Sequence, residues 1–106
     1  MANTYVNAKV DLTATSVTTL YTCVASTTAI IKSIVVSEDS GNADTITLTL
    51  TNGSDVYSLF KTKSVSANST VELLTAPLVV QATEILKVTA ATANRLHVVA
   101  SILEIT

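Results

Sequence analysis

The stretch DTITLTLTNGSDVYSLFK, residues 44–61, decides the fold class of this chain. Over residues 45–51, threonine alternates with isoleucine or leucine, and this period of two is typical of a strand with one buried face. Asn52-Gly53 follows, and both residues tolerate the positive φ angles that a two-residue type I′ turn requires. A second strand is expected over residues 55–62. The stretch therefore predicts a β-hairpin with one apolar face and one threonine-rich face.

The rest of the chain carries further short segments rich in Val, Ile and Thr, separated by polar residues that favour turns. We expect strands at residues 6–12, 17–25, 29–37, 70–75, 78–80, 85–90 and 95–105. Residues 70–80 form either two strands or one strand broken by Pro77, because proline donates no hydrogen bond to a ladder. About eight short antiparallel strands predict an all-β chain with a single β-sandwich domain over residues 1–106, of jelly-roll or immunoglobulin-like type.

Composition agrees with a β fold and excludes several classes of function. Val, Ile and Thr supply 40 of the 106 residues, and 48% of the chain is hydrophobic. The net charge is −2 and the six cations are scattered, so we expect no nucleic-acid partner. The sequence has no signal peptide and no run of about 18 apolar residues, which predicts a soluble protein without a membrane partner.

Candidate residues for chemistry are isolated in the sequence. His97 is the only histidine, and neither a general-base partner nor further metal ligands accompany it. Cys23 is the only cysteine, which excludes an internal disulfide, and its place in a strand without a CxxC spacing favours a small buried hydrophobe. We therefore predict no catalytic residue, no metal site and no cofactor, in a protein that is not an enzyme.

Two alternatives involve binding sites. The acidic loop of Glu38, Asp39 and Asp44 offers oxygen ligands for Ca²⁺, but it lacks the ligand spacing of an EF-hand, so we interpret it as an exposed, solvated loop. A glycan-binding module would stack sugars on aromatic rings, and it requires Tyr21 or Tyr57 to be exposed beside a groove. The chain has no Trp and its three tyrosines are spread over separate segments.

Two strands carry more apolar surface than one sandwich core requires. Residues 29–36 and 96–105 are apolar at both odd and even positions, whereas a strand of a two-layer sandwich buries one face. Soluble monomers rarely expose large apolar patches, so we expect the second face to bind a partner. The predicted interface residues are Ile30, Ile31, Ile34, Val36, Val99, Leu103 and Ile105.

Several segments resemble a known family. The segments TLYTCVASTTAIIKSIVVS (residues 19–37), NADTITL (42–48), ANSTVELL (67–74) and LKVTA (86–90) are similar to a recurrent pattern in small virion proteins of tailed bacteriophages. The resemblance concerns the strands and turns of a scaffold, and it implies no functional residue. It implies a non-enzymatic β-sandwich that is made in the host cytoplasm and resides in the virion.

The apolar excess and the resemblance together predict a capsid decoration or cement protein. Such a protein would oligomerise, as a trimer, and bind the major capsid protein. It would stabilise the assembled shell through buried apolar surface and strand pairing. Among structural proteins the alternative is a tail, neck or fibre-associated module. From another class, the alternative is a glycan-binding β-sandwich.

Overall fold

The computed structural model describes residues 2–106, which form nine β-strands. The strands are β1 (Asn3–Asp11), β2 (Thr18–Thr22), β3 (Thr28–Glu38), β4 (Asp44–Asn52), β5 (Asp55–Val65), β6 (Thr70–Glu72), β7 (Leu78–Val80), β8 (Ile85–Ala90) and β9 (Leu96–Ile105). Each predicted segment overlaps one of these strands, because each carries the regularly placed apolar residues that a buried sheet face requires. In the described part of the chain, no helix is long and apolar enough to cross a membrane.

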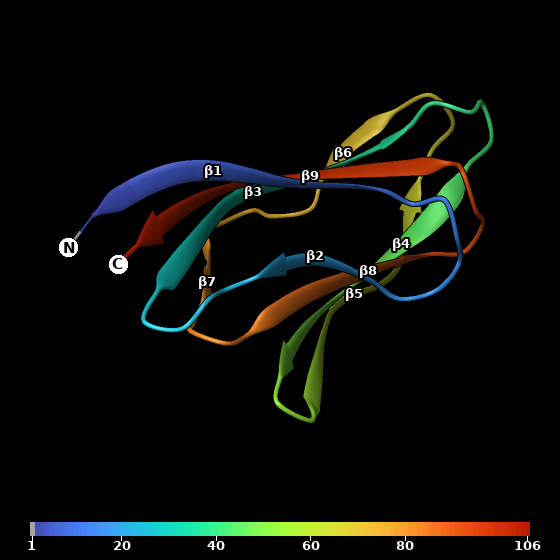
Figure 1. Cartoon of the computed structure of the whole chain (residues 1–106). Helices are drawn as coiled ribbons and strands as arrows, with labels where there is room; N and C mark the ends of the chain where they lie inside the picture. Colours follow the sequence, from blue (N-terminus) through green and yellow to red (C-terminus); the bar gives the residue numbers. More distant parts are fainter. Residues whose placement is uncertain (1) are drawn as a thin grey trace.

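The strands form two antiparallel sheets that pack face to face (Figure 1). Sheet A has the order β1-β9-β3, and both β6 and β7 pair with the far edge of β3. Sheet B has the order β2-β8-β4-β5. When β6 and β7 are counted as one interrupted edge strand, the strands are distributed between the sheets in jelly-roll order. The predicted all-β sandwich is confirmed, and its topology is the jelly-roll alternative rather than the immunoglobulin-like one.

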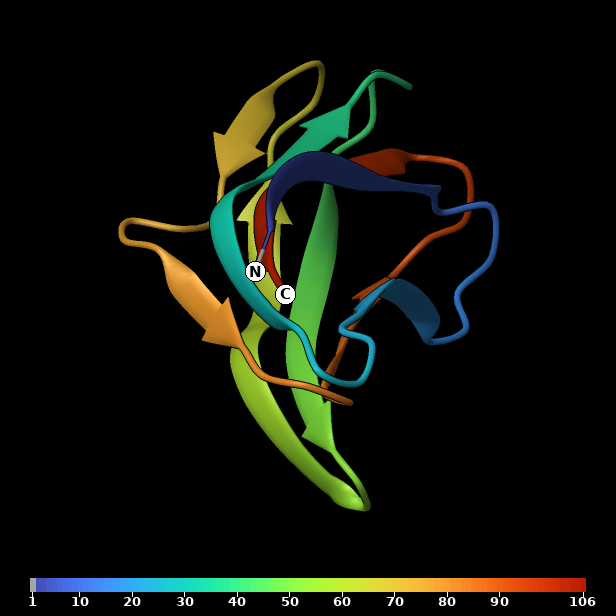
Figure 2. The ribbon, with the colours of Figure 1, turned by 60° about the vertical axis from the view of Figure 1, so that its left-hand side comes forward.

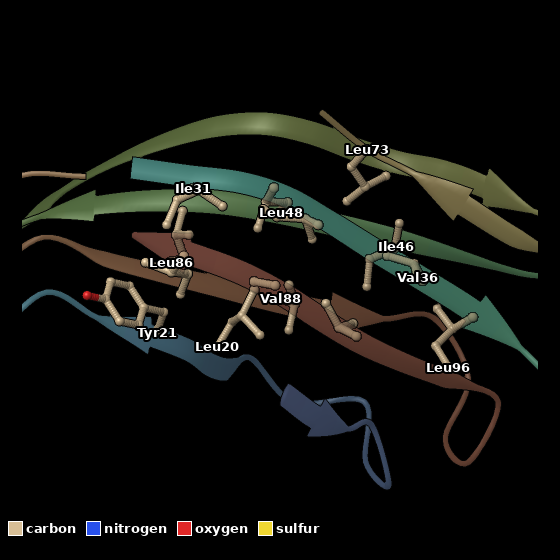
Figure 3. Close-up of a cluster of buried hydrophobic side chains, with 14 of the residues drawn as sticks. Leu20, Tyr21, Ile31, Val36, Ile46, Leu48, Leu73, Leu86, Val88 and Leu96 are labelled. Carbon is tan, nitrogen blue, oxygen red and sulfur yellow. The ribbon is translucent and has the colours of Figure 1, made fainter. Parts of the chain in front are cut away.

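The facing sides of the two sheets bury one hydrophobic core (Figure 3). The even-numbered apolar residues of β9 face this core, as the alternation of its sequence predicts. The central strands of sheet B, β8 and β4, supply the side chains opposite them, which are Ile46, Leu48, Leu86 and Val88. Burial of each large aliphatic side chain contributes about 1.5–3 kcal/mol, so this shared core is the main source of stability.

The β4–β5 hairpin is present as predicted, but its turn lies one residue further along. Asn52 pairs with Asp55, so the two-residue loop is Gly53-Ser54 and the predicted Asn52-Gly53 type I′ turn is wrong. Of the two loop residues only Gly53 has a positive φ, 63°, which is the pattern of a type II′ turn with glycine at its first central position. The hairpin projects from the body of the sandwich in both views (Figures 1 and 2).

Replacing Gly53 by alanine is expected to lower the free energy of unfolding by about 1–2 kcal/mol, because the left-handed region crowds the Cβ of an L-residue. A Cβ at this position would meet no atom within 4 Å, so the loss comes from the backbone alone. Chemical denaturation measures it. Ser54→Ala in the same loop is the control and should change stability by less than about 0.5 kcal/mol. Equal losses in the two variants would contradict this turn type.

A β-bulge in β3 explains why residues 29–36 are apolar at both parities. The pairing of β3 with β9 is regular on both sides of Lys32, which is left as an extra residue. Such a bulge shifts the alternation of side chains by one position. Odd-numbered residues therefore face the core up to Ile31, and even-numbered residues face it from Ile34 onward.

The gap between β6 and β7 lies opposite this bulge. β6 pairs with β3 beyond the bulge and β7 pairs with β3 before it. At the gap, the Ile34 amide N–H donates to the Glu72 carboxylate over 2.8 Å, and the Leu73 N–H donates to the Ile34 carbonyl over 2.9 Å. The Glu72 side chain thus satisfies a backbone donor that the broken strand leaves free. Of the two possibilities for residues 70–80, the structure shows two short strands.

Candidate interaction surface

The outer face of sheet A is the side of β1, β9, β3, β6 and β7 that points away from the core. The strand registers arrange its residues in rows that cross the sheet from β1 to the far edge. The rows are Asn3, Ile105 and Thr28; Tyr5, Leu103, Ile30 and Val79; Asn7, Ser101 and Ser33; Lys9, Val99, Val35 and Glu72; and Asp11, His97, Ser37 and Thr70.

The row that begins with Tyr5 is apolar from one edge of the sheet to the other. Tyr5 is 74% exposed and Val79 is 51% exposed, and the Leu103 and Ile30 side chains between them are half-buried. A continuous row of large apolar side chains is unusual on a solvated sheet face and is typical of a binding surface. This row makes the outer face of sheet A the candidate interaction surface.

The structure places four of the seven predicted interface residues on this outer face. They are Ile30, Val99, Leu103 and Ile105. Val99 is the most exposed of them, at 42%. Their role in binding stays a prediction.

The other three predicted interface residues require a correction. Ile31, Ile34 and Val36 are 0% exposed and belong to the sandwich core. Ile31 lies before the bulge at Lys32, on the odd-numbered side of β3 that faces the core, so it was assigned to the wrong face. For Ile34 and Val36 the reason is the bulge, which turns the even-numbered residues inward beyond Lys32. Completely buried side chains offer no surface to a partner of the folded chain.

His97 lies at one end of the outer face, between two carboxylates. Its Nδ1 is 3.4 Å from Asp11 Oδ1, and its Nε2 is 3.2 Å from Asp39 Oδ1. Because each ring nitrogen faces an acid, neither is placed to take a proton from a nearby hydroxyl group. The ring borders a shallow hollow of 260 Å³, lined by Lys9, Val10, Asp11, His97, Val98 and Val99. The histidine thus joins β1, β9 and the loop after β3 at the rim of the surface.

Glu38 is buried, so the prediction of a wholly solvated acidic loop is wrong for this residue. Its carboxylate accepts hydrogen bonds from the Ser40 backbone N–H and hydroxyl, from the Gly41 N–H (3.1 Å) and from the Asn68 N–H (3.0 Å). Burial alone would raise the pKa of Glu38, but these donors outweigh it and lower the pKa from 4.5 to about 2. The side chain thereby joins the loop after β3 to the loop after β5.

Asp44 is also buried, and its Oδ2 accepts a hydrogen bond from the Thr92 N–H over 3.0 Å. The three acids considered as Ca²⁺ ligands therefore point at different partners: Glu38 at two loops, Asp39 at His97, and Asp44 at the turn after β8. Within residues 2–106, no three His, Cys, Asp or Glu side chains gather closely enough to hold a metal ion. The acidic residues act here as hydrogen-bond acceptors that hold loops together.

Tyr21 lies in β2, whereas Cys23 is the residue after the end of β2 and not in a strand as predicted; both are buried in the core. The Tyr21 hydroxyl donates to Glu104 Oε2 over 2.5 Å, which ties β2 to β9 across the sandwich. Burial, reinforced by this hydrogen bond, raises the pKa of Tyr21 well above its ordinary value. Burial also raises the pKa of the Cys23 thiol, whose Sγ donates to the Thr27 carbonyl. Cys23 is thus a buried, protonated side chain, as its sequence context predicted.

The tyrosines do not form a platform for a sugar. Tyr21 is buried, Tyr57 is exposed on the projecting β5 strand, and Tyr5 lies on the outer face of sheet A. Neither the hollow beside His97 nor the second hollow, of 290 Å³ between β4, β5 and Ala91, is lined by a tyrosine. The glycan-binding alternative required Tyr21 or Tyr57 to be exposed beside a groove. Tyr21 is not exposed, and Tyr57 is exposed but lines neither hollow.

Sequence reasoning missed Tyr5 and Val79, the two ends of the apolar row. Tyr5 stands directly before the alternating residues 6–12, and Val79 is the middle residue of a segment, 78–80, that is apolar throughout but only three residues long. The row exists because β1 pairs with β9 and β7 pairs with β3, which brings together residues far apart in the chain. No local signal reports such neighbours, because strand pairing across the sheet is a property of the tertiary structure.

Comparison with known proteins identifies a shared fold but no family. No family model and no curated protein matches this sequence. Among solved structures, a chain of the Bacillus endospore appendages, which form a family of disulfide-linked pili, has the same fold with a TM-score of 0.60. The similarity covers 99% of this chain and 87% of the other, at 14% sequence identity. This chain is therefore similar in fold to a protein of the Bacillus endospore appendages.

Proposed function

We propose that this chain is a non-enzymatic structural subunit of a larger particle, and that it decorates the shell of a virus. The observation that carries the proposal is the outer face of sheet A, where an apolar row crosses a sheet of a jelly roll from edge to edge. The fold similarity to a pilus protein supports an architectural role. The sequence resemblance to small virion proteins supports a virus particle as the location.

The assembly that we propose for this chain is non-covalent, unlike the disulfide-linked assembly described for the appendage proteins. The appendage proteins are described as forming disulfide-linked pili. In this chain Cys23 is the only cysteine and is 0% exposed. One thiol per chain joins at most two chains, so disulfides could not link these subunits into a polymer. Association of this subunit is therefore non-covalent and depends on apolar burial and complementary charge.

Electron microscopy with an antibody against this chain tests the proposed function. The sample is virus particles purified from a lysate that contains the chain, and gold label is expected over the whole shell. Label confined to a tail, neck or fibre would overturn the decoration role in favour of the alternative structural module. The absence of label from purified particles, with the chain present in the soluble fraction, would overturn the structural role in a virion.

A further inference from the structure

We propose that the outer face of sheet A binds a second copy of this chain about a two-fold axis that runs parallel to the strands. The inference rests on the proposed function in so far as both require self-association, and it adds the surface, the symmetry and the facing residues. It replaces the trimer expected from sequence with a symmetric pair, because the rows of this face are complementary to themselves.

A two-fold axis parallel to the strands, placed between β9 and β3, reverses each row. The first residue of a row on one copy then faces the last residue of the same row on the other copy. Tyr5 faces Val79, and Leu103 faces Ile30, so the apolar row packs against itself. Isologous interfaces require this kind of self-complementarity, in which the same patch serves both subunits.

Charge placement favours this axis over one that runs across the strands. Lys9 and Glu72 stand at opposite ends of one row, with Val99 and Val35 between them. Reversal of the row sets Lys9 of each copy against Glu72 of the other, which gives two attractive pairs at the rim. An axis across the strands would instead set Glu72 against Val79 and leave its charge beside an apolar side chain. Complementary charge at the rim of an interface fixes its orientation.

Lys32 is the one charged residue near the centre of the face. It is the extra residue of the β3 bulge, it is exposed, and it lies next to the gap between β6 and β7. In the proposed pair the two Lys32 backbones approach each other near the axis. Their long side chains can extend toward solvent at the gap, but the like charges oppose association. The pair is therefore expected to tighten when this charge is removed.

The dimensions of the face suit a specific interface. β1 contributes nine residues to its length, and at about 3.3 Å per residue and about 4.8 Å between strands, a four-strand face covers roughly 570 Å² in plan. Side-chain relief adds to this area, and specific interfaces bury about 800 Å² per partner. The centre of the face is apolar or carries Ser101 and Ser33, and apart from Lys32 the ionisable groups lie at its margins, which matches the usual anatomy of an interface.

Sedimentation velocity of the intact chain tests the association. The wild-type chain is expected to form dimers, and Val99→Glu, which places a charge at the centre of the face, is expected to weaken dimerisation about tenfold or more. Val56→Glu is the matched control, because Val56 is 62% exposed but lies on the projecting hairpin. Lys32→Ala is expected to strengthen the dimer. A wild-type monomer, a trimer, equal effects of the two glutamates, or a weaker dimer in Lys32→Ala would overturn the proposal.

Cross-linking tests the direction of the axis. In the double variant Tyr5→Cys with Val79→Cys, a short thiol-specific bismaleimide is expected to join two chains, because each new thiol faces the other residue on the second copy. Within one chain the two positions are three strand spacings apart, about 14 Å, beyond the reach of this reagent. Each single variant and the wild type, with buried Cys23, should stay unlinked. Dimers linked in Tyr5→Cys alone would overturn this axis.

The experiments distinguish failure of the proposed two-fold dimer from failure of the proposed decoration role. Gold label on the shell together with a monomeric chain in sedimentation would remove the two-fold pair and leave the decoration role. A dimer cross-linked through positions 5 and 79, without label on any particle, would remove the decoration role and leave the pair.

Discussion

Replacing Ile34 by alanine is expected to lower the free energy of unfolding by about 3 kcal/mol, as for other large-to-small changes in a packed core. Ile34 is 0% exposed and packs between the two sheets, so truncation removes apolar contacts and leaves a cavity. Chemical denaturation measures the loss. Because the side chain lies within one folded unit, the loss should not depend on protein concentration.

Ile30→Ala is the matched control for this experiment. It is the same chemical change on the same strand, but Ile30 lies before the bulge and faces outward, half-buried. Its effect on the unfolding of the monomer is expected to be smaller, below about 1.5 kcal/mol. Any further loss should depend on protein concentration, because it acts through association. If both variants lost the same free energy of unfolding at every protein concentration, the result would contradict the conclusion that Ile30 faces outward and Ile34 faces the core.

Replacing Glu38 by glutamine is expected to lower the Tm by about 10 °C at neutral pH. The carboxylate accepts hydrogen bonds from three backbone N–H groups and one hydroxyl, and it joins the loop after β3 to the loop after β5. Glutamine has a single acceptor oxygen and no charge, so part of this network is lost. Thermal unfolding followed by circular dichroism measures the change.

The effect of Glu38 is expected to depend on pH in a defined direction. Its pKa is lowered from 4.5 to about 2 in the folded chain, so folding is favoured by the ionised form. The contribution is fully present above pH 4.5 and is lost as the pH falls from 4.5 toward 2. The difference in Tm between the wild type and Glu38→Gln should therefore be constant near neutral pH and shrink in acid. A difference that grows below pH 4.5 would contradict this role.

Glu84→Gln provides the control for the size of the effect. The Glu84 carboxylate accepts one backbone N–H, from Gln81 over 2.7 Å, within a single turn. The same acid-to-amide change is therefore expected to lower the Tm less than Glu38→Gln does. A comparable fall would show that the removal of any acidic side chain destabilises this chain, rather than the loss of the connection between two loops.

The parts of the fold that were predicted correctly are those with local signals. The alternation of threonine with Ile46 and Leu48 identified β4 and its buried face, and the even-numbered apolar residues of β9 all face the core. The strands were separated correctly because turn-forming residues lie between the apolar segments, but several ends were misplaced by three residues: β1 begins at residue 3 rather than 6, and β5 ends at residue 65 rather than 62. The turn itself was misplaced by one residue, because the bulges in the β4–β5 ladder and the pairing of Asn52 with Asp55 decide which residues are left over.

The candidate site was predicted less well, and the bulge in β3 is one physical reason. The sequence identified β3 and β9 as strands with apolar residues on both sides, and the structure explains this differently for the two strands. In β9 the second apolar set lies on the outer face, whereas in β3 the bulge at Lys32 turns Ile34 and Val36 into the core. A bulge changes the facing of every later residue, and its position depends on the partner strand.

By itself, the sequence determined the all-β class and the strand segments, because periodicity, turn residues and residue types are local properties. Only the tertiary structure decided the jelly-roll order, the burial of Glu38 and the rows of the outer face. The physical reason is that pairing energy comes from contacts between residues distant in the chain, so many registers agree with the same local pattern. The apolar row from Tyr5 to Val79 exists only once β1, β9, β3 and β7 are placed side by side.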